Sequence, residues 1–85
     1  MFFVYILKSK KDDKFYIGYT NNLRKRLKKH NLGLVGSTKS RIPLHLVYYE
    51  AYAIQQDATK REHNLKLRAK ALKELKNRIQ KSLKA

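Results

Sequence analysis

Cysteine is absent from this 85-residue chain, and proline occurs only once. Without cysteine the chain has no disulfide, no thiolate zinc site and no cysteine nucleophile, and we expect a cytoplasmic location. A chain of this length predicts a single domain over residues 1–85, with a modest core. Its 42% apolar content favours a folded protein over a disordered one.

Acidic residues are also scarce, with 6 Asp and Glu against 21 Lys and Arg, which gives a formal net charge of +15. So positive a field indicates a polyanionic partner, nucleic acid in preference to an acidic membrane surface, although solubility alone is the simpler alternative. No long apolar run is present. Residues 1–7 are too short for a membrane span, and no basic segment precedes them as a signal peptide would require.

Two strands are predicted at the start of the chain. Residues 2–8 form an almost continuous apolar run, and residues 15–20 are aromatic and β-branched around Gly18. The polar residues 9–14 between them favour an antiparallel hairpin. Tyr5 and Tyr16 project from the same face if facing residue numbers add to an odd value, and from opposite faces otherwise.

A basic helix is predicted over residues 22–31. Thr20, Asn21 and Asn22 are suited to accept the first free N–H groups, and Leu23 and Leu27 would face a core. The same four-residue interval places Arg26 and His30 together beside the leucines. Lys25 and Lys29 would lie on the solvent side.

Residues 32–43 are expected to form a loop, which is long for a domain of this size. Thr38, Lys39 and Arg41 in this loop could donate hydrogen bonds to phosphate oxygens. A plain solvated connection is the alternative.

The remaining chain predicts a strand over residues 44–52 and then helices. Simple alternation puts Leu44, Leu46 and Tyr48 on one face of that strand. A second helix is expected from residue 53 or 54, followed by a basic helix over residues 66–83. The apolar stripe of the second helix would be Ile54, Ala58, Glu62 and Leu65, and that of the last helix Leu72, Leu75, Ile79 and Leu83.

Glu62 stands out because an isolated carboxylate in an apolar stripe needs either a cation partner or a metal ion. Lys66, one helical turn later, could pair with it or reach a substrate. Arg26 could pair with Glu50 or Glu62, or could bind two phosphate oxygens. Most tyrosines on strands are core residues, and a phenol with a pKa near ~10 is a poor base at neutral pH.

Several short segments, in this order and spacing, resemble the GIY-YIG nuclease family, in particular its small stand-alone bacterial members. These include Val4-Tyr5-Ile6, Tyr16-Ile17-Gly18, Arg26, His30 and Glu62. Val4 departs from the first motif, and a late asparagine of the family has no secure counterpart. The resemblance implies an α/β (α+β) fold, with a three-stranded antiparallel sheet flanked by helices.

The resemblance also implies hydrolysis of phosphodiester bonds with one divalent ion, Mg²⁺ or Mn²⁺, bound to Glu62. Arg26 would stabilise charge in the transition state, and Tyr5, Tyr16 and His30 would position water or phosphate. Further nucleic-acid contacts would come from Lys25, Lys29, Thr38, Lys39, Arg41 and Lys66.

Two functions therefore compete. The first is a metal-dependent DNA endonuclease, in repair or in processing of branched or nicked DNA, with RNA left open as a substrate. The second is a non-catalytic nucleic-acid-binding module that keeps the fold. For both we expect a monomer or weak dimer, no membrane attachment and no small-molecule cofactor.

Overall fold

A three-stranded antiparallel sheet lies at the centre of the computed structural model, which describes residues 1–85. The strands are β1 (Phe2–Ser9), β2 (Phe15–Thr20) and β3 (Leu44–Tyr52), in the order β2-β1-β3. The helices are α1 (Leu23–Asn31), α2 (Gln55–Leu67), α3 (Ala69–Arg78) and α4 (Gln80–Leu83), with a short 3-10 turn at Lys39–Arg41. The predicted α/β class with a three-stranded sheet is confirmed. No helix has the length and apolar character needed to cross a bilayer.

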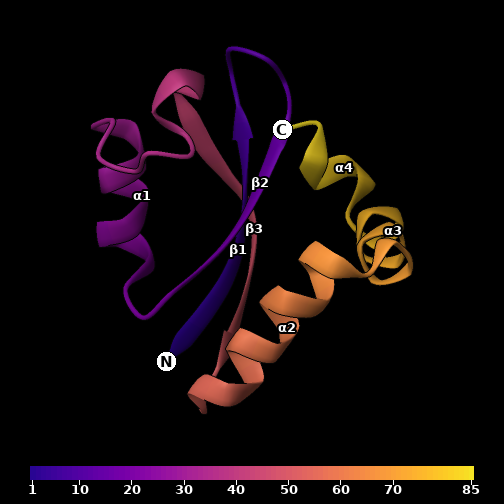
Figure 1. Ribbon diagram of the computed structural model, residues 1–85. Coiled ribbons are helices and arrows are strands. Elements are labelled where there is room, and N and C mark those ends of the chain that lie inside the picture. Colours follow the sequence, from indigo (N-terminus) through magenta and orange to yellow (C-terminus); the bar gives the residue numbers. More distant parts are fainter.

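The sheet separates α1 from the other helices, as Figure 1 shows. Val4 and Ile6 of β1 point to one face and pack with Ala58, Leu65 and Leu75 of α2 and α3. On the other face, Tyr5 and Leu7 pack with Leu44, and the leucines of α1 cover them. Since β1 is the middle strand, its side chains are buried on both faces, which explains its apolar run.

The register of the hairpin decides where its tyrosines point. Tyr5 faces Gly18 and Leu7 faces Tyr16. This is the odd-sum pairing, so Tyr5 and Tyr16 share the face of the sheet that α1 covers.

The expected alternation along β3 is wrong at its middle. Leu46 pairs with Leu7 and Tyr48 pairs with Ile6, which leaves Val47 as an extra residue in a bulge. Leu46 consequently lies on the α1 face, whereas Tyr48 packs with the core under α2. The bulge therefore separates Tyr48 from Leu44 and Leu46.

Helix α1 is fixed at both ends. The side chain of Asn22 accepts from Lys25 N, which caps the first turn. At the other end Gly33, with φ of 74°, lets Gly33 N bond His30 O and Leu34 N bond Lys29 O, a Schellman ending.

Asn31, the last residue of α1, joins the helix to the sheet. Its amide nitrogen donates to Leu44 O at 2.8 Å, and its amide oxygen accepts from Leu44 N at 2.7 Å. The beginning and the end of the segment 32–43 are therefore held together by one side chain.

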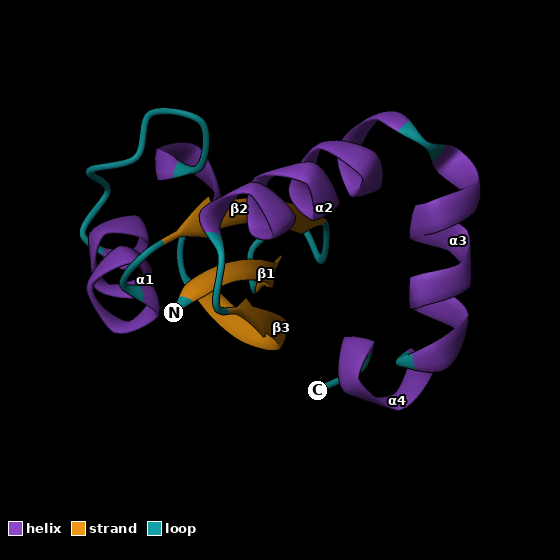
Figure 2. Cartoon of the chain, turned by 90° about the horizontal axis from the view of Figure 1, so that it is seen from below, coloured by secondary structure: helices purple, strands orange, loops and turns teal.

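The C-terminal part is not the single basic helix that was expected over residues 66–83. Helix α2 continues to Leu67, Arg68 is extended (φ −113°, ψ 103°), and Ile79 ends α3 before α4 begins. Figure 2 shows how these breaks turn the chain back toward the sheet. Leu75 is buried as a result, and Ile79 packs against the same core.

The expected apolar stripe of α2 is only partly right. Ala58 and Leu65 are buried, but Ile54 lies before the first turn of the helix and is 55% exposed. Glu62 lies between the buried positions and remains partly exposed.

Candidate active site

Tyr5 lies at the centre of the site. It is 1% exposed, and its ring covers the backbone of Gly18 on the neighbouring strand. A Cβ atom at residue 18 would lie 2.3 Å from both Cζ and Oη of Tyr5. Glycine is therefore required here, because any side chain would overlap the Tyr5 ring.

Helix α1 brings Arg26 and His30 to this tyrosine from two successive turns. Arg26 Nε donates to Tyr5 Oη at 3.3 Å, and His30 Nε2 lies 2.9 Å from the same oxygen. His30 is completely buried, and its Nδ1 lies 2.8 Å from the hydroxyl of Thr38, which is also buried. The phenol is thus fixed between a guanidinium and an imidazole.

One arrangement of protons satisfies this whole network. The Thr38 hydroxyl donates to Val35 O, so it accepts from His30 Nδ1–H. His30 Nε2 then accepts the Tyr5 hydroxyl proton, and Tyr5 Oη accepts from Arg26. This assigns His30 as the neutral Nδ1–H tautomer.

The electrostatic surroundings agree with a neutral imidazole and a neutral phenol. Burial, with a smaller effect from the Arg26 charge, lowers the pKa of His30 to about 4. Burial also raises the pKa of Tyr5, although the hydrogen bond from Arg26 opposes this. That hydrogen bond in turn raises the pKa of Arg26, which remains a permanent cation. Tyr5 is therefore better suited to hold Arg26 than to accept a proton.

Tyr16 is the second phenol of the site and lies on the edge strand β2. Its ring centroid is 6.4 Å from that of Tyr5 and 5.1 Å from that of His30. It is only partly buried, and Arg26 is close enough to its hydroxyl for that contact to be among the smaller causes that raise the pKa of Arg26. Of the two phenols, only Tyr16 is partly exposed, so it is the one that a ligand can reach.

Glu62 reaches this group from α2, which contacts β2 as well as β1. Its Oε2 lies 2.8 Å from Lys66 Nζ, and the same ammonium is 5.8 Å from the centre of the Tyr16 ring. The Glu62 charge is also among the smaller causes that raise the pKa of Tyr5. The acid therefore lies on the side of the hairpin tyrosines.

The alternative pairing of Arg26 with Glu50 or Glu62 is wrong. Glu50 is held by Arg61, and Glu62 is paired with Lys66. Arg26 forms no ion pair, and its guanidinium is oriented mainly by the hydrogen bond to Tyr5, with a smaller effect from Tyr16. A guanidinium without an acidic partner retains its affinity for an anion.

A divalent ion of the magnesium type fits Glu62 as a single protein ligand. Oxygen is the preferred donor of Mg²⁺, which usually keeps several waters and binds through one or two carboxylates. Only one oxygen of Glu62 is paired, and the side chain is 22% exposed, so the carboxylate is accessible to a hydrated ion. No cluster of three acidic, histidine or cysteine side chains offers a fully protein-lined metal site.

A cationic depression of about 170 Å³ opens beside Arg26. Lys25 and Lys29 line it together with Arg26 and the polar residues at the start of α1, and no hydrophobic residue takes part. The two lysines expected to contact nucleic acid thus lie together at one opening. An anion such as a phosphate group matches its charge.

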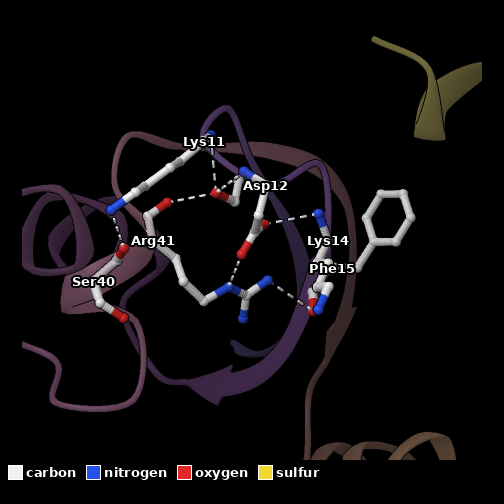
Figure 3. A network of polar contacts seen from close by, with 7 residues as sticks. Lys11, Asp12, Lys14, Phe15, Ser40 and Arg41 are labelled. Carbon is white, nitrogen blue, oxygen red and sulfur yellow. Dashed lines mark hydrogen bonds and ion pairs between the residues drawn. The ribbon is translucent and has the colours of Figure 1, made fainter.

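The expectation that Thr38 and Arg41 face a phosphate is not met in this structure. Thr38 is 0% exposed and is a partner of His30. Arg41 bonds Asp12 at 3.1 Å and the carbonyl of Phe15, as Figure 3 shows. Both residues tie the segment 32–43 to the rest of the fold, because each has a polar partner within the protein.

Two other lysines of the predicted set differ in their surroundings. Lys39 is exposed and forms no ion pair, so it remains accessible to a polyanion. Lys66 is occupied by Glu62, although its side chain is 43% exposed.

Two structural roles were not anticipated from the sequence. Thr38 orients His30, and Gly18 makes room for Tyr5. A glycine inside a strand is often a position that another group approaches closely, but it does not identify that group. Nothing in the sequence pattern could identify the partner of Thr38, because that contact depends on how the loop folds back.

Comparison with known proteins agrees with this geometry. A family model described as the GIY-YIG catalytic domain matches residues 1–80. The chain therefore belongs to the GIY-YIG family, and a catalytic domain of this kind indicates nuclease activity as a general class.

Within the family, its relatives are UPF0213 proteins. It is 46% identical to UPF0213 protein CPE1444 of Clostridium perfringens, over 78% of this chain and 71% of that protein. It is 43% identical to a UPF0213 protein of Staphylococcus aureus, over 89% of this chain and 95% of that protein. The solution NMR structure of UPF0213 protein BH0048 from Bacillus halodurans is similar, with 35% sequence identity and a TM-score of 0.54. The match covers 88% of this chain and 82% of that chain.

Proposed function

We propose that this protein is a divalent-metal-dependent endonuclease that hydrolyses phosphodiester bonds in DNA. The observation that carries the proposal is the contact of Arg26 and His30 with Tyr5, beside the partly exposed phenol of Tyr16. Glu62 approaches the same group from a different helix. These side chains come from β1, β2, α1 and α2 and lie close together, and this grouping supports a site for one phosphate.

Arg26 is proposed to bind the phosphate under attack. Its guanidinium lies at the rim of the cationic depression and has no acid to neutralise it. Tyr5 fixes the orientation of Nε, and no acid competes with a phosphate for the rest of the guanidinium. Preorganised positive charge of this kind stabilises charge that develops on phosphorus.

His30 and Tyr16 are proposed to have different tasks. His30, neutral and fully bonded within the protein, keeps Tyr5 in place and is a positioning residue. Tyr16 is proposed to orient a water molecule, because it is the more exposed of the two phenols. From the sequence, either Tyr5 or Tyr16 was expected to position the water, and this proposal selects Tyr16.

Glu62 is proposed to hold the metal ion, Mg²⁺ or Mn²⁺. When bound there, the ion would act as a Lewis acid that polarises a phosphate oxygen. Lys66 would have to release Glu62 or share it with the ion, since the ammonium now occupies one carboxylate oxygen.

The charge of +15 favours DNA held mainly through its phosphates. Lys25, Lys29 and Lys39 are proposed as further contacts with the backbone. Branched or nicked DNA in repair is the proposed substrate, and RNA is the alternative that the same chemistry would accept. We propose a cytoplasmic protein that acts as a monomer or weak dimer.

The test is cleavage of supercoiled, nicked and branched DNA, each with Mg²⁺, Mn²⁺ or a chelator. We expect cutting only with metal, and a loss of about 100-fold or more in Glu62→Gln and in Arg26→Ala, as for other groups that stabilise transition-state charge. Lys60→Gln is the matched control, because it removes an exposed charge from the same helix.

A non-catalytic binding module is the second candidate. The Glu62–Lys66 pair favours it, because the acid already has a cation partner within the protein. Salt-dependent binding of DNA without any cutting in either metal would support this candidate and overturn the nuclease.

A further inference from the structure

A second and larger cavity lies on the other side of the start of α1. It measures about 500 Å³ and has mainly apolar walls, to which Phe3, Leu27, Leu46 and Tyr49 contribute. Small-molecule sites typically have volumes of about 300–1,000 Å³ with mostly apolar walls and a few polar groups. None of the side chains assigned to phosphate or metal binding lines this cavity.

An exposed aromatic ring distinguishes this cavity. Tyr49 is 51% exposed, although it lies on strand β3 beside the core. Phe3 supports it in an edge-on contact, with ring centroids 5.9 Å apart and planes inclined by 63°. A ring that is held on one side and exposed on the other offers a surface on which a flat ligand can stack.

Polar groups stand at the rim of the apolar walls. Arg24 and Asn21 are both exposed and take part in lining the cavity, and the Asn21 amide has no protein partner. An amide carries both a donor and an acceptor, which is what the edge of a nucleobase requires. Asn22, in contrast, is occupied as the cap of α1.

The apolar cavity adjoins the cationic depression beside Arg26. Asn21 and Asn22 line both, so the two openings meet at the start of α1. A nucleotide has the same layout, with a charged phosphate next to a flat and largely apolar base. A second copy of this chain is a poorer occupant, because each copy carries a charge of +15 and would be repelled.

We propose that the Phe3–Tyr49 cavity binds an unpaired nucleobase of the nucleic acid whose backbone occupies the cationic depression. The inference rests on the proposed binding of nucleic acid but not on cleavage. It gives the protein a reason to prefer DNA with a bulged, flapped or single-stranded nucleotide, since a base inside a duplex cannot enter the cavity.

The experiment compares two DNA duplexes that differ only in one extra, unpaired 2-aminopurine, with a chelator present so that no cutting occurs. Fluorescence anisotropy gives the dissociation constants, and 2-aminopurine quenching reports stacking. We expect tighter binding of the bulged duplex, and in Tyr49→Ala a loss of about fivefold to hundredfold for that duplex, the range for loss of one stacking platform. Binding of the paired duplex should change by less than about twofold, because phosphate contacts dominate it.

Two further variants separate stacking from simple apolar contact. Tyr49→Phe retains the ring and should keep both the preference and the quenching. Tyr49→Leu retains apolar volume but has no π face, and should behave as Tyr49→Ala does. Leu67→Ala is the control for loss of an exposed apolar side chain, since Leu67 is 68% exposed and lies at the end of α2.

Three results would overturn the proposal. These are equal affinity of the unaltered protein for both duplexes, an equal loss for both in Tyr49→Ala, and a dimer by light scattering that Tyr49→Ala dissociates while DNA binding is unchanged. Circular dichroism melting of each variant shows whether the fold is intact. Failure of the nuclease proposal would appear separately, as absence of metal-dependent cutting, and would leave the binding comparison valid.

Discussion

Two pairs of tyrosines lie on opposite faces of the same sheet and have opposite surroundings. On the α2 face, Tyr48 and Tyr52 both donate to the carboxylate of Glu50, Tyr48 at 2.6 Å. Arg61 adds two more hydrogen bonds to Glu50, at 2.9 and 3.1 Å. On the α1 face, Tyr5 and Tyr16 surround the cation Arg26 and the imidazole of His30.

We call the polar cluster of Glu50, Arg61, Tyr48 and Tyr52 the closed cluster, because its members hydrogen-bond one another. Burial alone would raise the pKa of Glu50, but the hydrogen bonds from Arg61 and the two phenols hold it below its ordinary value. Burial, together with Glu50, raises the pKa of Tyr48 and Tyr52 to about 12. Each polar group in this cluster has a partner, so the cluster joins β3 to α2 and has no capacity for a ligand.

We call the group of Tyr5, Tyr16, Arg26, His30 and Glu62 the open cluster, because it retains hydrogen-bonding capacity for a ligand. One oxygen of Glu62 has no ion-pair partner, Arg26 has no acid, and Tyr16 is partly exposed. A small protein of one sheet thus contains both kinds of polar cluster, and the unused hydrogen-bonding capacity of one of them indicates the site. Predictions that treat the two clusters in parallel test this distinction.

The largest effect on the free energy of unfolding should come from Glu50→Ala, and Glu62→Ala is its comparison. Removing Glu50 leaves Arg61 and two phenols without their acceptor, so we expect a loss of about 3 kcal/mol in the free energy of unfolding. Glu62 forms one partly exposed pair, and its removal should cost less than about 1 kcal/mol. Urea unfolding followed by circular dichroism gives both values.

Equal losses for the two variants would erase the distinction between a structural and a functional acid. Arg61→Ala is a second check on the closed cluster, because it leaves Glu50 with its phenols alone. Its loss should lie between those of the two glutamate variants.

The next effect concerns pH and the open cluster. The pKa of His30 is about 4 in the folded protein and 6.5 in its ordinary state, so below pH 6.5 the unfolded chain binds a proton that the folded chain does not. The contribution of His30 to the free energy of unfolding is therefore fully present above pH 6.5 and is lost as the pH decreases toward 4. We expect His30 alone to remove about 2 kcal/mol between pH 7 and pH 5.

His30→Gln supplies the comparison for this effect, since it cannot be protonated. Its unfolding free energy should be lower at pH 7 but should change much less between pH 7 and pH 5. His63→Gln, at an exposed position, should keep the pH dependence of the unaltered protein. A pH dependence that persists in His30→Gln would contradict the assignment of a neutral buried imidazole.

The last comparison concerns Gly18→Ala. The added Cβ would overlap the Tyr5 ring at 2.3 Å, so the ring or the strand has to move, at a cost of about 1–3 kcal/mol. Gly36→Ala is the matched control, because no atom lies within 4 Å of a Cβ there. Gly36→Ala should be neutral or stabilise by about 0.5 kcal/mol.

For Gly18→Ala, both the thermal unfolding temperature and the rate of DNA cleavage are measured. We expect Gly18→Ala to lower both, because displacement of Tyr5 also releases Arg26. Unchanged cleavage in a destabilised Gly18→Ala protein would mean that the orientation of Tyr5 does not matter for the open cluster.

Much of this fold follows from local patterns in the sequence. The apolar run of β1, the hairpin and the asparagine cap of α1 lie where residue types predict them. The four-residue spacing correctly brings Arg26 and His30 together, and both reach Tyr5. These features depend on contacts close in sequence or on a strict period.

The features that were missed depend on contacts between distant segments. A bulge at Val47 leaves no composition signal, yet it moves Tyr48 to the other face of the sheet. Arg68 interrupts the predicted long helix without proline or glycine, because burial of Leu75 outweighs the local preference to continue. Thr38 looked like a phosphate donor, but its hydroxyl is taken by His30.

The double hydrogen bond between Asn31 and Leu44 has a consequence for how this domain can evolve. It sets the distance between the two anchor points of the intervening segment, whatever number of residues connects them. Gly36 is exposed within that segment, beyond the hydrogen bonds of Gly33 and Leu34 that end α1. Extra residues inserted at this place would add little entropy cost and would leave the guanidinium and phenol where they are. New specificity elements could therefore be acquired there without rebuilding the chemistry.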